Sequence, residues 1–183
     1  MHQNTYTTGA ELQTMREALH MGRDELATLC GVQARTIKHW ENGRAGVPAD
    51  VADLAHELER VAHIASQHAA QQVQRLAAKH GRAPDDLVLI RYRTAADLAR
   101  FRPDMQHLPP GIHAAIVART AAQARAQGIT ARIVWMNADE FDAWRSASQP
   151  PRPDTEAARS EWAAVAALQQ QATPHRADQP PAD

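Results

Sequence analysis

A chain of 183 residues can form one hydrophobic core of moderate size and has room for a second, smaller one. Apolar residues make up 44% of the chain but aromatic residues only 4%, and alanine supplies much of the apolar share, which favours Ala-rich helices over a β-sandwich. The formal net charge of −1 excludes a basic polyelectrolyte, and the single cysteine, Cys30, excludes an intramolecular disulfide and a multi-cysteine zinc site.

The first predicted helix starts at a capping box. Thr8 and Glu11 have the spacing at which each side chain bonds the backbone amide of the other. The helix is predicted to run to about His20, and its core-facing side is expected to consist of Leu12, Met15, Ala18 and Leu19.

Two short helices joined by a tight turn are predicted next. Gly31 is placed to end the first of them, because glycine adopts a left-handed conformation without strain, and Gly43 ends the second in the same way. Gln33 is the predicted cap of the second helix, which runs to Trp40 or Glu41. The inward face of the pair is expected to consist of Leu26, Leu29, Ile37 and Trp40.

The outward face of the second short helix carries long hydrogen-bonding side chains, which suit a DNA major groove. Basic residues do not outnumber acidic ones over residues 1–50, so the argument rests on where they lie rather than on bulk charge. An ordinary helical hairpin is the alternative. The outward residues are Gln33, Arg35, Lys38 and His39.

A long helix is predicted from Pro48 to about His80, with a candidate break near His68. Beyond a linker at 81–85, residues 87–92 and 129–136 have the composition of strands, and helices are predicted at 94–101 and 112–127 between them. Two strands alone make a marginal sheet, so we expect them to pair with the same strands of a second chain.

After residue 137 the sequence predicts a helical extension. It contains a helix at 138–147 capped by Asn137, a Pro-rich linker at 149–153 and a helix from a cap at Asp154 to about residue 171. The inner side of that last helix is expected to consist of Trp162, Val165 and Leu168, and residues 172–183 have the composition of a disordered tail.

The predicted fold class is therefore α+β, mainly α, in three parts. Residues 1–80 form a helix-turn-helix domain with a long connecting helix, residues 81–137 a small strand-helix-helix-strand dimerisation domain, and residues 138–183 the helical extension.

The short helical pair resembles that of Xre/Cro-type helix-turn-helix repressors. A closer similarity, to the YdiL-like repressors that include anti-CRISPR-associated regulators, covers about residues 8–136, and residues beyond 137 depart from that family. The first match rests on Ala27, Gly31-Val32, Ile37 and Trp40-Glu41-Asn42-Gly43, and the second on Glu11-Leu12-Gln13, Arg16, Ala34-Arg35, Trp40-Glu41, Gly43-Arg44 and Val47-Pro48.

The resemblance implies a homodimeric, sequence-specific transcriptional repressor that binds an inverted repeat in double-stranded DNA and controls its own operon in a phage or mobile element. It also implies an ion pair between Arg16 and Glu41. The residues expected to read bases are Gln33, Ala34, Arg35 and His39. Those expected to contact phosphates are Arg23, Lys38, Asn42 and Arg44. Because the extension lies outside the resemblance, we expect a chain that ends at Ala147 to keep its operator affinity.

Two other functions stay open: an antitoxin-type regulator whose C-terminal half binds a partner protein, and an RNA-binding regulator that uses the same basic helix. No Gly-rich phosphate loop, GxSxG motif or Cys/His pair argues for an enzyme, and no cofactor is expected. His56 and His63 lie seven residues apart, about 10 Å along a helix, which is too far for one metal ion. No stretch is long enough for a transmembrane helix and residues 1–4 do not start a signal peptide, so we expect a cytoplasmic protein.

Overall fold

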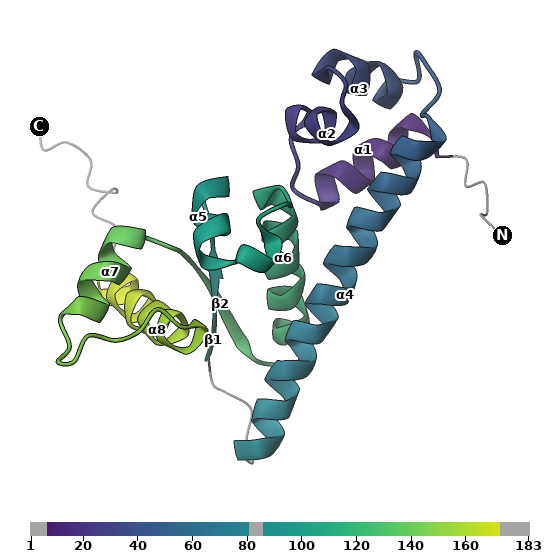
Figure 1. The fold of residues 1–183 in the computed structure, drawn as a ribbon. Coiled ribbons are helices and arrows are strands. Elements are labelled where there is room, and N and C mark those ends of the chain that lie inside the picture. Colours follow the sequence, from purple (N-terminus) through teal and green to yellow (C-terminus); the bar gives the residue numbers. More distant parts are fainter. Residues whose placement is uncertain (1–6, 81–85, 173–183) are drawn as a thin grey trace, which may run out of the picture.

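The computed structural model describes residues 7–80 and 86–172. The predicted linker at 81–85 and residues 173–183 of the tail predicted at 172–183 lie outside them. Within the described residues the chain is mainly helical with one small sheet, which confirms the predicted α+β class (Figure 1). In chain order the elements are α1 (Gly9–Ala18), α2 (Arg23–Cys30), α3 (Ala34–Glu41), α4 (Ala49–His80), β1 (Asp86–Arg91), α5 (Ala95–Phe101), the short 3₁₀ helix η1 (Pro103–Met105), α6 (Pro110–Ala126), β2 (Thr130–Trp135), α7 (Ala138–Ser146) and α8 (Glu156–Ala172).

The ends of the first three helices are fixed by local chemistry. The Thr8 amide donates to Glu11 Oε2 at 2.7 Å and the Glu11 amide donates to Thr8 Oγ1 at 3.2 Å, so the predicted capping box is present. Gly31 ends α2 with a φ of 65°, and Gly43 follows α3 with a φ of 68°. Both glycines therefore have the left-handed conformation that the sequence predicted.

The predicted inward faces of α1 and α2 are wrong at one residue each. Leu29 is 37% exposed and Ala18 is also exposed. On a helical wheel, each lies about 100° from the centre of the side that its helix buries. The short helix α2 packs through Leu26, Ala27 and the half-buried Cys30, which leaves Leu29 beside the contact rather than within it.

The connecting helix α4 is continuous past His68, so the candidate break does not occur. Its 32 residues give a rod about 48 Å long that spans most of the molecule (Figure 1). One end of α4 packs on α1 and a longer stretch packs on α6. This helix thus joins the N-terminal helices to the sheet-containing part.

β1 and β2 pair with each other in parallel, with Asp86 opposite Thr130 and Arg91 opposite Trp135. The crossover between them contains α5, η1 and α6, as parallel pairing requires. α6 packs on one face of the sheet and α8 on the other (Figure 1). The predicted order of strand, helix, helix and strand is therefore confirmed, and each strand has one strand neighbour among the described residues.

The last helix packs differently from the sequence prediction. The Ala158 amide donates to Thr155 Oγ1 at 3.2 Å, so Thr155 caps α8 instead of Asp154. Trp162 is buried as predicted, whereas Val165 is 36% and Leu168 63% exposed. The buried side of α8 is made chiefly of small residues that let it lie close to the sheet, namely Ala158, Ala163, Ala166 and Ala167 around Trp162.

One hydrophobic cluster runs from α1 to α8, so the N-terminal helices and the sheet share a core. The two parts meet where α6 begins. A Cβ atom on Gly111 would lie 2.6 Å from the carbonyl oxygen of His20, which has a φ of 53°. Only glycine allows so close an approach of the two backbones at this point.

Candidate nucleic-acid interface

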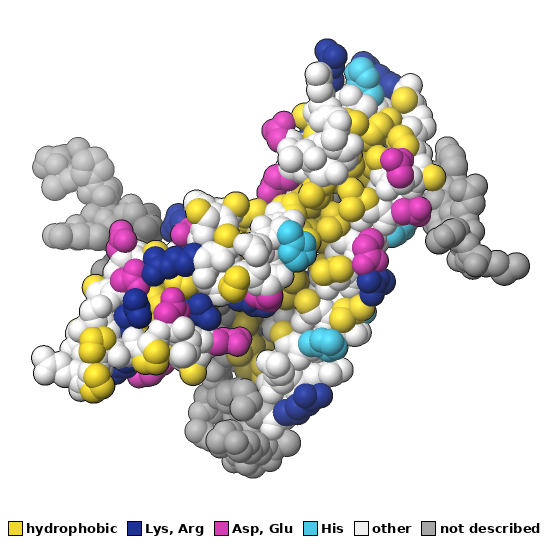
Figure 2. Space-filling view, in the orientation of Figure 1, with side chains coloured by type: hydrophobic (Ala, Val, Ile, Leu, Met, Phe, Trp, Pro, Cys, Tyr) yellow, Lys and Arg dark blue, Asp and Glu magenta, His cyan; other side chains and the backbone are white. Residues whose placement is uncertain are grey.

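The exposed face of α3 contains most of the residues that the sequence assigned to base reading. Gln33 is the N-cap of α3, and Arg35 and His39 project from the helix into solvent. Ala34 differs from them, because it is half-buried and packs against the core. Figure 2 shows basic and histidine side chains gathered at the end of the molecule where α3 lies.

The opposite face of α3 anchors the helix. Ile37 is fully buried and Trp40 is 8% exposed, so both side chains belong to the core. Trp40 is therefore a packing residue and is not available to stack on a base.

Glu41 is the centre of a buried ionic cluster. Its side chain is completely buried, and its two carboxylate oxygens accept hydrogen bonds from Arg16 Nε and Arg23 Nε, both at 2.6 Å. Arg16 also donates from Nη1 to the carbonyl oxygen of Met21 at 2.8 Å. The structure thus brings Arg16 and Glu41 together and ties α3 to α1 and to the start of α2.

The charge state of Glu41 follows from these contacts. Burial by itself would raise the pKa of the carboxyl group, but the hydrogen bonds and positive charges of Arg16 and Arg23 outweigh burial and lower the pKa. Glu41 is therefore ionised at neutral pH. Because its charge is sequestered, the exposed surface of α3 presents Arg35 and Lys38 without a carboxylate from the same helix.

Arg23 has a role that sequence reasoning missed. Its side chain is 40% exposed and it bonds the carboxylate of Glu41. The two residues are separated by 18 positions, which matches no helical spacing, so no local pattern could predict their contact. This contact makes Arg23 a support for α3.

The loop after α3 holds the last two candidates. Asn42 is the exposed C-cap of α3, and its backbone amide donates to the carbonyl oxygen of Lys38 at 3.1 Å. The amide of Arg44 donates to the carbonyl oxygen of His39 at 2.9 Å, so the loop folds back on the helix end. The side chains of Lys38, Asn42 and Arg44 are all exposed and lie at the same end of the molecule as α3.

Two short packed helices with a left-handed glycine between them, the second with a polar outer face, define a helix-turn-helix DNA-binding domain. Residues 8–88 match the family model of a helix-turn-helix domain, a range that begins at the cap of α1 and ends in β1. No curated protein matches the chain. The N-terminal part is accordingly a DNA-binding module of the helix-turn-helix class.

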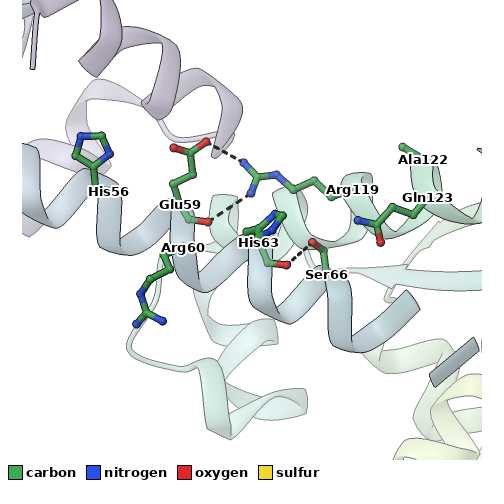
Figure 3. A pocket seen from close by; sticks show the side chains of 8 residues that line it. All are labelled: His56, Glu59, Arg60, His63, Ser66, Arg119, Ala122 and Gln123. Atoms are coloured by element: carbon green, nitrogen blue, oxygen red, sulfur yellow. Dashed lines mark hydrogen bonds and ion pairs between the residues drawn. The ribbon is translucent and has the colours of Figure 1, made fainter. Parts of the chain in front are cut away.

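A hollow lies between α4 and α6, away from α3, and has a volume of about 580 Å³ (Figure 3). The two arginines at this hollow form ion pairs. Arg119 lies 3.7 Å from the carboxylate of Glu59, and Arg60 lies 2.5 Å from that of Glu57. His56 and His63 line the hollow.

Over the described residues, no group of three or more His, Cys, Asp or Glu side chains is arranged to hold a metal ion. None of the described helices is long and apolar enough to cross a membrane.

Proposed function

We propose that this protein is a sequence-specific transcriptional repressor that binds an inverted repeat as a homodimer and controls its own operon. The observation that carries the proposal is the outer face of α3, where Arg35, Lys38 and His39 are exposed while the only acidic residue of the helix is buried. A helix of this kind presents donors to base edges and phosphates without repulsion from its own carboxylate.

We assign each residue of the DNA interface a role from its position on or near α3. Arg35 lies in the first turn of α3, where recognition helices meet base edges, and we assign it to a guanine. Gln33 and His39 are its neighbours in base reading, and Ala34 is left with a limited contact because it is half-buried. We assign Lys38, Asn42 and Arg44 to phosphates, and Arg23 to the support of α3 rather than to DNA.

The test compares two arginines on the same surface. Selection of bound duplexes from a random pool first gives the operator. On that operator, Arg35→Ala should cost about 1–3 kcal/mol and relax the preference for one guanine per half-site, with much less effect on random DNA. Arg44→Ala should weaken binding to both DNAs similarly and reduce the salt dependence by about one counterion per monomer. Equal losses on operator and random DNA for Arg35→Ala would contradict base reading by Arg35.

A homodimer requires an interface between the two chains. We propose that this interface forms through the exposed side chains of β2 and through the edge of β2 away from β1. Ile133 is 41% and Trp135 39% exposed, and the two side chains lie two positions apart on the same face of the strand. The guanidinium groups of Arg91 and Arg93 lie 4.8 and 4.6 Å from the centre of the Trp135 ring. Within the part of the chain that the structure describes, β2 pairs only with β1, so its other edge offers backbone groups to a second chain.

Ile133→Glu should yield a folded monomer, since a carboxylate cannot be buried in an apolar contact without a partner. Sedimentation velocity with and without operator DNA measures this, and the monomer should bind a single half-site weakly. Leu168→Glu is the matched control, because Leu168 is 63% exposed on α8 and is not assigned to the interface. If Leu168→Glu gives the monomer and Ile133→Glu does not, the dimer forms through α8.

A further inference from the structure

A cleft of about 310 Å³ runs along the edge of β1 that does not pair with β2. Its floor is formed by residues 87–90, and its walls come from α4, α6 and the first turns of α8. Figure 1 shows β1 between α6 and α8, with α4 beyond α6. The volume lies near the lower end of the roughly 300–1,000 Å³ that small-molecule sites occupy.

Most of the cleft wall is apolar. The side chains of Leu89, Ile116 and Val117 line it from the strand and from α6, and Val73 adds a contribution from α4. An apolar wall of this size favours a hydrocarbon body over a strongly hydrated ligand.

His113 gives the cleft a polar group that the fold does not use. The side chain is 5% exposed and lines the cleft, and its Nδ1 atom has no hydrogen-bond partner among the described residues. Burial, followed by the positive charge of Arg102, lowers the pKa of His113 to about 4, so the imidazole is neutral at pH 7. A buried polar atom without a partner destabilises the fold, which argues for a role outside the packing of the domain.

The ring of His113 is held in place by Tyr92, with the two ring centres 4.8 Å apart. Tyr92 itself stacks on Phe101 at 5.9 Å. The orientation of His113 is therefore set before any ligand arrives, which lowers the entropic cost of binding.

Two arginine side chains also line the cleft. Arg102 and Arg159 line it and are only partly exposed, at 37% and 16%. Arg159 forms an ion pair with Asp154, whose Oδ1 lies 3.2 Å from Nη1. The carboxylate in the lining is that of Glu156, which is exposed to water. Arg102 is held by Asp104, which accepts from its Nε at 3.0 Å and from its Nη2 at 2.7 Å. Arg159 has the single, longer carboxylate contact and keeps N–H groups that an anion can accept from.

We propose that this cleft is a binding site for a small apolar carboxylic acid. Its chain lies against Leu89, Ile116 and Val117, and its carboxylate offers one oxygen to Arg159 and the other to His113 as the neutral Nδ1–H tautomer. The site is independent of the proposed repressor function, because it concerns a different surface and its binding can be measured without DNA. Since α4 forms one wall and continues to the helix-turn-helix domain, an occupied cleft also has a direct structural connection to the DNA-binding end.

The hollow between α4 and α6 in Figure 3 is a poorer candidate. It is larger, but unlike the cleft it contains no buried polar atom without a partner among the described residues. It therefore provides a control surface on the same helix as His113.

The test is calorimetric titration of the full chain with octanoate, and with octanol and octylamine as probes of equal length but different charge. Octanoate should bind in a 1:1 ratio, at least tenfold more tightly than either of the others. His113→Phe and Arg159→Gln should each weaken octanoate binding at least tenfold, whereas Arg119→Gln in the other hollow should leave it unchanged.

A structural role and a ligand-binding role for His113 give different results. His113→Phe keeps the ring on Tyr92 and removes the unpaired nitrogen, so the melting temperature at pH 7 should stay the same or rise while octanoate binding is lost. The proposal is overturned if folded full-length protein shows no saturable octanoate binding, or if the affinity is unchanged in both His113→Phe and Arg159→Gln. It is also overturned if octylamine binds as tightly as octanoate.

Discussion

Glu41 is the residue on which the orientation of α3 depends. Arg16 is 8% exposed and would be left with an uncompensated buried charge if its carboxylate partner were removed. We expect Glu41→Gln to lower the free energy of unfolding by about 3–5 kcal/mol, measured by urea denaturation. Glu17→Gln is the control, because Glu17 contacts the same arginine but is 57% exposed, and its loss should cost well under 1 kcal/mol. Similar costs for both variants would show that the buried cluster contributes little.

His113 predicts how stability depends on pH. The pKa of an unfolded histidine is about 6.5, and that of folded His113 is about 4. Between pH 6.5 and pH 4 the histidine is protonated in the unfolded chain but largely neutral in the folded one. The free energy of unfolding therefore decreases as the pH falls, and at pH 5 it is about 2 kcal/mol lower than at pH 7. Glu41, whose pKa is lowered by folding, loses its contribution only below its unfolded pKa of about 4.3. Urea unfolding at pH 7 and pH 5 should therefore show a drop that His113→Phe removes, and an equal drop in both proteins would contradict this assignment.

At the scale of helices and strands, the sequence predicts best what local chemistry decides. The capping box at Thr8, the left-handed Gly31 and the cap at Asn137, whose side chain accepts from the Glu140 amide, each involve residues within a few positions of one another. The order and approximate limits of the elements were predictable for this reason.

Contacts between distant segments were not predictable in the same way. The exposed Leu29 and the pairing of Arg23 with Glu41 both depend on how α1, α2 and α3 pack, which no spacing in the sequence encodes. The cleft along β1 is also outside the reach of pattern reasoning, because α4, α6 and α8 come together there from separate parts of the chain. The role of His113 could not be predicted from its neighbours in the sequence, because a single histidine in an Ala-rich helix does not by itself indicate a binding site.

On the scale of the whole molecule, α8 decides where the folded unit ends. Alternation along the strands turns Val88 and Ile90 to the side of the sheet that α8 covers, and these residues belong to the same cluster as Trp162. The Trp162 ring also lies 6.1 Å from that of Phe141 in an edge-to-face arrangement. We therefore propose that α8 belongs to the same folded unit as the sheet, although the resemblance expected from the sequence stops near residue 136.

Removing α8 tests this proposal, and the shortened chain ending at Ala147 is the one that the sequence analysis expects to keep its operator affinity. Without α8 the sheet would expose one apolar face, and loss of the Trp162 side chain alone should cost about 3–5 kcal/mol. The shortened chain should melt at least 10 °C lower than the full chain and bind a hydrophobic dye, whereas a chain ending at Ala172, which keeps α8, should melt normally. Trp162→Ala should fall between the two. A chain ending at Ala147 that melts at the same temperature as the full protein would show that α8 only rests on the sheet, and that the folded unit ends where the resemblance does.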